Sequence, residues 1–353
     1  MAPVYSDYYD LVTEYGNLNA VQDAIDASGG NFRFEEFIWG VLSGEIKLDL
    51  GMLIDMLGEF AFSDLNSCMP QVFRIVGIAL IAAVFSNFSF SFRESNVADT
   101  AFYVCYLILY GILALTFTTA YEITADAVSH ITGFMKVLVP SYCIAIALGN
   151  GTATSLYWYE SILIIIMLAE NLLLRIILPL IGVHMTVNLS GNISNENILS
   201  KLCELLEQVI GWGLKGITAV VFGVSGLQNM LAPAIDRFKR TTLIKSAESI
   251  PGIGNMIGGI NETLLGAGVL LKDAFGAGGI IAVGVITIMP LIRLCIYAFV
   301  YKAEAAVIQP VSDKRIVNCL NAASKASVLM LKTVFTAAAL FVVAIALVAY
   351  TSL

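Results

Sequence analysis

Three polar side chains interrupt an apolar stretch of this sequence that is long enough to cross a bilayer. The stretch runs from Ser161 to Val183, and the side chains are those of Glu170, Asn171 and Arg175. About 20 apolar residues span a hydrocarbon core of ~30 Å, and a charge near its centre costs roughly 2.5–3.5 kcal/mol. The charged groups must therefore face protein or water. We expect this span to form the inner wall of a helix bundle.

The spacing of the two charges limits how they could pair. Glu170 and Arg175 are five positions apart, whereas side chains that stack along an α-helix are three or four apart. Each charge is therefore expected to need a partner on a neighbouring helix, and Arg293 and Glu160 are the candidates. The predicted buried polar cluster is Glu160, Glu170, Asn171, Arg175 and Arg293. It has two interpretations: a clamp that fixes helix packing, or the lining of a water-filled path.

A second unusual segment, residues 249–276, combines seven glycines with weak apolarity. Small residues four apart let helices approach closely, which favours close packing. A mobile or re-entrant gate is the alternative, and whether the segment crosses the membrane stays open. The candidate residues for this packing or gating segment are Gly252, Gly254, Gly258, Gly259, Asn261 and Glu262.

The sequence offers no residue set for catalysis or for a resident cofactor. The only histidines, His130 and His184, lie far apart and outside any HExxH pattern. No GxxxxGK[ST] phosphate-binding loop is present, and the six cysteines form no CxxC pair. We therefore expect no catalytic, cofactor-binding or metal-binding residues, and a protein that is not an enzyme.

The composition indicates the class of fold in which these residues lie. The chain is 58% hydrophobic and only 13% charged, whereas soluble domains carry about 25% charged residues. We expect an all-α, polytopic membrane helical bundle with about seven or eight crossings and amphipathic interfacial helices. The apolar pattern of residues 48–65 predicts one such interfacial helix.

Charge divides the chain into two predicted domains. Residues 1–70 hold twelve Asp or Glu against two basic residues, whereas residues 71–353 are slightly basic. An acidic segment disfavours nucleic acid as a partner and suits the outer side of a membrane. We expect residues 1–70 to form an extracytoplasmic head and residues 71–353 to form the transmembrane helical domain.

The apolar runs predict where the chain crosses. Residues 72–92 and 100–121 are expected as the first two spans, followed by a short polar helix over 122–132 and a marginal span over 134–148. The last span is expected at 328–350. Short cytoplasmic segments are rich in Lys and Arg, so the charge pattern predicts residues 302–325 inside and residues 188–210 outside.

The chain resembles the stage III sporulation protein AE family in three motifs. These are Pro251-Gly252-Ile253-Gly254, Pro290-Leu291-Ile292-Arg293, and the segment Ala305–Ala326, which contains Gln309-Pro310-Val311-Ser312-Asp313. The order of acidic head, Glu-bearing span and glycine-rich segment is also similar.

That resemblance implies a multi-pass protein of the mother-cell membrane, the outer forespore membrane. It implies a place in the channel, or feeding-tube, complex of endospore formation, together with other stage III sporulation channel proteins and a separate ATPase that supplies energy. A homo-oligomer and contact with membrane lipid are expected. The alternative is a stand-alone secondary transporter that uses Glu170 and Arg175.

Overall fold

The computed structural model describes residues 18–29, 32–43, 95–150, 152–193, 199–223, 254–310 and 312–350, together with Pro70, Phe73, Gly77 and Ile81. Every regular element in these residues is a helix, which confirms the all-α fold class. Five described helices are long and apolar enough to cross a membrane. The expected count of seven or eight crossings is therefore not confirmed. The expected first span at 72–92 and the interfacial helix at 48–65 lie outside the described ranges, apart from single residues.

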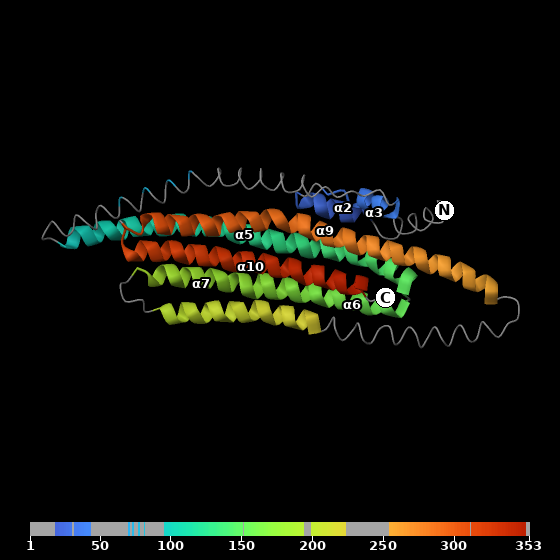
Figure 1. The fold of residues 1–353 in the computed structure, drawn as a ribbon. Coiled ribbons are helices and arrows are strands. Elements are labelled where there is room, and N and C mark those ends of the chain that lie inside the picture. The colour runs from blue at the N-terminus through green and yellow to red at the C-terminus, as the bar shows by residue number, and fades with distance from the viewer. Residues whose placement is uncertain are drawn as a thin grey trace.

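Three long helices form the centre of the bundle (Figure 1). Helix α5 is Ser95–Asn150, α9 is Gly254–Ile308 and α10 is Lys314–Tyr350. Beside them run α6 (Thr152–Ala169), the π-helix η1 (Glu170–Ile177) and α7 (Leu178–Gly191) as one continuous rod. A further helix, Ser200–Gly223, lies next to α7. Van der Waals packing of apolar and small side chains drives such association in a membrane.

Helix α5 is continuous where the sequence predicted three separate segments. It contains 56 residues and has Pro140 in its interior. Its length is about 84 Å at 1.5 Å per residue, which exceeds the thickness of a bilayer. The predicted short helix over 122–132 is wrong as a separate element, because buried residues such as Thr124, Val128 and Ile131 continue the packed face through it.

Helix α9 is equally uninterrupted. It contains 55 residues and includes most of the glycine-rich segment, so Gly254–Gly276 makes no re-entrant turn. Close packing is observed just beyond that segment: a Cβ atom built on Gly279 would come within 2.8 Å of Leu138 on α5 and 3.2 Å of Ile345 on α10. At this position only glycine lets the three helices approach so closely.

Contacts among the long helices fix how they are aligned along the bundle. The Tyr301 hydroxyl donates to Thr116 Oγ1 at 2.6 Å, and Gly279 lies against Leu138. Residues 116–138 of α5 therefore run beside residues 279–301 of α9, which belong to a strongly apolar span. The candidate span in α5 is Tyr103–Ala145, which includes both this part and nearly all of the predicted span 100–121.

The α9–α10 turn and the end of α7 lie at the same end of the bundle (Figure 1). Tyr106 on α5 contacts both the Leu189 carbonyl and the Cys319 sulfur, and Lys325 pairs with Glu207. The prediction that residues 188–210 and 302–325 lie on opposite sides of the membrane is therefore wrong. It assumed that 100–121 and 134–148 cross separately, whereas α5 is one helix.

Part of the predicted head packs on the bundle. Helices α2 (Leu18–Ala27) and α3 (Phe34–Ser43) contact α5 and α9 respectively. The Phe34 ring lies 5.8 Å from the Phe275 ring, and Gly278 faces Phe34 and Phe37. This contact lies toward the end of the bundle opposite the α9–α10 turn (Figure 1). The predicted boundary at residue 70 falls among residues that are mostly undescribed and stays a prediction.

We expect the α7 end and the α9–α10 turn to face the same compartment. In a chain with the native cysteines replaced, Ser190→Cys and Gln309→Cys should both react with a membrane-impermeant thiol reagent from the same side of sealed vesicles. Both positions are exposed. Labelling of the two positions from opposite sides would contradict the fold.

Candidate functional site

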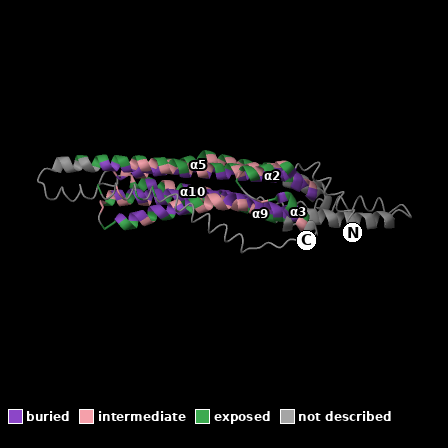
Figure 2. Cartoon of the chain, turned by 90° about the horizontal axis from the view of Figure 1, so that it is seen from above, coloured by how far each residue is buried: buried purple, intermediate pink, exposed green. Residues whose placement is uncertain are grey.

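One face of α5 carries polar residues at helical spacing, and the described part of the chain leaves them exposed. Residues three, four or seven apart share a side of an α-helix. The exposed residues of this face, called the α5 polar face below, are Thr118, Glu122, Asp126, Ser129 and Lys136. The residues coloured as buried lie on the side of α5 toward α9 and α10 (Figure 2).

The position of the α5 polar face along the bundle is what makes it unusual. It lies within residues 116–138, level with the apolar part of α9 that ends at Tyr301. Neither Glu122 nor Asp126 forms an ion pair within the part of the chain that the structure describes. Charged side chains at membrane depth almost always face a protein interior or water. On this chain they face outward.

An ion pair extends the α5 polar face onto the neighbouring helix. Lys136 Nζ lies 2.7 Å from Glu170 Oε2, with the two side chains 49% and 40% exposed. Glu170 thus has a partner on a neighbouring helix, as expected, but this partner is Lys136 and not the candidate Arg293. The signal that could have found it is a single lysine inside the apolar run 134–148.

The π-helix changes how Glu170 and Arg175 are related. Element η1 begins at Glu170, and at its end the Leu178 amide donates to the Leu173 carbonyl, five residues back. Residues five apart lie above one another in this geometry, so Glu170 and Arg175 share a side of the helix. The expectation based on α-helical spacing is therefore wrong. Such π-turns are rare and are frequent at functional sites.

The predicted cluster is not buried. Asn171, Arg175, Glu160 and Arg293 are exposed, while Leu173 and Ile177 form the inner wall of the rod. Glu160 lies ten residues before Glu170, about 15 Å along the same helix. Of the five predicted residues, the structure brings Glu170, Asn171 and Arg175 together on η1.

The predicted packing or gating segment lies at the start of α9. Gly254, Gly258, Gly259, Asn261 and Glu262 fall in its first turns. Gly252 is outside the described residues, and side chains are described from Lys272 onward. Neither close packing nor gating by these six residues is tested, and both stay predictions.

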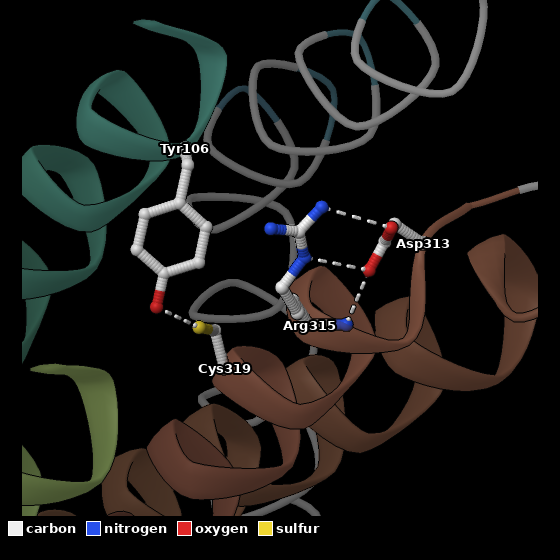
Figure 3. Close-up of polar contacts among 4 residues, drawn as sticks. All are labelled: Tyr106, Asp313, Arg315 and Cys319. Atoms are coloured by element: carbon white, nitrogen blue, oxygen red, sulfur yellow. Dashed lines mark hydrogen bonds and ion pairs between the residues drawn. The ribbon is translucent and has the colours of Figure 1, made fainter. Parts of the chain in front are cut away.

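A cluster of polar contacts fixes the end of the bundle near the α9–α10 turn (Figure 3). Tyr106 Oη donates to the Leu189 carbonyl at 2.6 Å and lies 2.9 Å from Cys319 Sγ. Asp313 Oδ1 accepts from the Arg315 amide at 2.8 Å, which makes Asp313 the N-cap of α10. The Arg315 side chain also binds both Asp313 oxygens, at 3.2 and 3.3 Å. These contacts give the Gln309–Asp313 motif a structural role.

Two buried groups near this end lack hydrogen-bond partners within the described residues. Both carboxylate oxygens of Glu304 and the Nδ1 atom of His184 are unpartnered, although Glu304 is 2% and His184 1% exposed. Leaving a buried polar atom unsatisfied costs about 1–3 kcal/mol. Glu304 could not be identified from the sequence, because it lies in residues 302–325, which were expected to be a polar cytoplasmic segment.

Comparisons with known proteins place this architecture in a family. The family model described as stage III sporulation protein AE matches residues 32–352. A curated protein called "Stage III sporulation protein AE", from Bacillus subtilis (strain 168), is 23% identical over 317 residues, covering 90% of this chain and 77% of that protein. No solved structure matches the chain.

We expect the Lys136–Glu170 pair to matter through its charges. Lys136→Glu and Glu170→Lys should each lower the amount of folded protein in membranes and its thermal midpoint in detergent, because each variant places two like charges together at membrane depth. The double exchange should recover at least half of the loss. The same exchange at the exposed pair Lys201–Glu204 is the control and should change little. Equal losses in the single and double variants would contradict the pairing.

Proposed function

The chain belongs to the stage III sporulation protein AE family, and on this premise we propose that it is a membrane component of the channel that joins mother cell and forespore. Its role in the complex is to form part of a conduit and not to catalyse a reaction. The energy comes from a separate ATPase, and the other subunits are further stage III sporulation channel proteins.

The α5 polar face carries this proposal. Glu122, Asp126 and the Lys136–Glu170 pair lie outward at the level of apolar spans. Lipid is a poor environment for these groups, so in the membrane the face borders water or another polypeptide. The described residues of a single chain do not enclose a water-filled space beside this face. Several copies of the chain, or this chain with its partner subunits, enclose it.

The distribution of charge supports an orientation in the mother-cell membrane. Basic residues gather around the α9–α10 turn, whereas the acidic helices α2 and α3 pack toward the opposite end. Cytoplasmic ends of membrane proteins are rich in Lys and Arg. This supports the turn facing the mother-cell cytoplasm and the head facing the space between the two membranes. The basic residues near the turn are Lys302, Lys314, Arg315 and Lys325.

The paired polar groups near the α9–α10 turn are used in packing and helix capping, which supports a structural role for that end of the bundle. Tyr106 donates a hydrogen bond to the Leu189 carbonyl, and Asp313 accepts hydrogen bonds from the amide and the side chain of Arg315.

A stand-alone secondary transporter is the second candidate, favoured by one observation. The π-helix places Glu170 and Arg175 on one side of an interrupted span, and transporters bind substrates and ions at such interruptions. Uptake by the purified chain alone in vesicles would favour this candidate over the channel component.

We expect the double variant Glu122→Leu/Asp126→Leu to reduce heat-resistant spores at least 100-fold in the sporulating host. An apolar surface at these positions would expel water from the passage. The chain should still reach the membrane and co-purify with the other channel proteins. The control is Asp23→Asn, which removes an exposed acidic group on α2 and should leave spore counts unchanged. Normal spore counts in the double variant would remove the α5 polar face from the conduit.

A further inference from the structure

A groove of about 900 Å³ runs between the Ser200–Gly223 helix and α10, on elements other than those of the α5 polar face. Its apolar walls include Trp212 and Phe222 from the first helix and Phe335 from α10. These side chains are 68%, 51% and 59% exposed, so the other described elements leave them largely uncovered.

Two lysines in this groove have no anionic partner among the described residues. Lys215 and Lys332 both line it, both are exposed, and neither forms an ion pair within the described part of the chain. The two acidic residues of the lining are already neutralised: Glu204 pairs with Lys201 at 2.8 Å and Glu207 with Lys325 at 3.4 Å. The groove therefore carries two uncompensated positive charges.

The groove has a polar end, and Lys215 and Lys332 lie about two helical turns deeper in the membrane-spanning part than that end. Lys325 and Glu207 mark that end, and Lys332 and Lys215 follow them by seven and eight residues. This is about 10 to 12 Å along the helices. A lysine at this depth extends its aliphatic stem along apolar surface and directs its ammonium group toward the headgroup region.

A polar hollow of about 180 Å³ adjoins the groove and shares Glu204 and Glu207 with it. His184 lines the hollow with Asn188 and Asn192. The His184 side chain is buried, and its Nδ1 atom has no hydrogen-bond partner among the described residues. The hollow thus holds an unsatisfied polar atom next to the charged end of the groove.

We propose that this groove binds one anionic phospholipid. The phosphate lies between the ammonium groups of Lys215 and Lys332, and the acyl chains cover Trp212, Phe222 and Phe335. The polar headgroup points toward the hollow and its hydrogen-bonding side chains. Basic pockets between transmembrane helices bind anionic headgroups in this way. A second copy could offer the carboxylates of Glu122 or Asp126, but the proposed function assigns these to the conduit wall. A phospholipid supplies an anion and apolar chains in one molecule.

Trp212 provides a direct probe of this site. The chain contains three tryptophans, and Trp39→Phe/Trp158→Phe leaves Trp212 alone. Phosphatidylglycerol with brominated acyl chains, titrated into the full-length protein in detergent, should quench Trp212 fluorescence saturably. Brominated phosphatidylcholine should quench it only at much higher concentration. Inorganic phosphate should not displace the lipid, because it lacks the acyl chains.

Two kinds of variant test separately how the charge and the shape of the groove contribute to lipid binding. Lys215→Gln/Lys332→Gln should weaken phosphatidylglycerol binding about thirty-fold, since each lysine near an anionic lipid surface contributes about 1 kcal/mol. Ala219→Phe, which fills the groove without changing charge, should also weaken binding. Lys302→Gln/Lys314→Gln removes the same charge elsewhere and should have no effect. Equal quenching by the two lipids, or phosphatidylglycerol binding that is unchanged in the lysine double variant, would overturn the proposal.

Discussion

The cost of placing charge in a bilayer organises this structure. Glu122, Asp126 and the Lys136–Glu170 pair lie at the level of apolar spans, and they face away from the core of their own chain. A soluble protein could leave them in water at little cost, but a membrane protein cannot leave them in lipid. In the channel component proposed above, water or a neighbouring subunit would therefore border this face in place of lipid.

The rest of the bundle holds that face in position. Helix α5 stays helical through its polar middle because its opposite side packs continuously against α9 and α10. The three helices are aligned by Gly279 at one level and by Tyr301 with Thr116 at another. At the end near the α9–α10 turn, Tyr106 ties α5 to α7 and α10. The continuous rod of α6, η1 and α7 then brings Glu170 beside Lys136.

The fold class and the polar positions within a span could be predicted from the local sequence pattern, whereas the contacts between helices depend on packing. Apolar composition was sufficient for the all-α membrane class, and Glu170, Asn171 and Arg175 stood out as polar residues inside a span. The sequence did not show that these side chains face outward, because an interrupted span has the same sequence pattern whether its polar side faces inward or outward. The pairing of Glu170 with Lys136 was missed because it joins two helices, and local spacing does not show which helices are neighbours. The shared side of Glu170 and Arg175 was missed because α-helical spacing was assumed where a π-helix occurs. The continuity of α5 was missed because Glu122 and Asp126 resemble a loop signal when their buried neighbours are not known.

Thiol accessibility along α5 in native membranes tests the central claim most directly. Single cysteines at Glu122, Asp126 and Ser129, in a chain without other cysteines, should react with a small hydrophilic reagent when the complex is assembled. Cysteines at Phe299 and Phe335, which are exposed apolar positions on α9 and α10, should not react. If the three α5 positions are as unreactive as the two controls in the assembled complex, the α5 polar face does not border water, and the account of a conduit wall is contradicted.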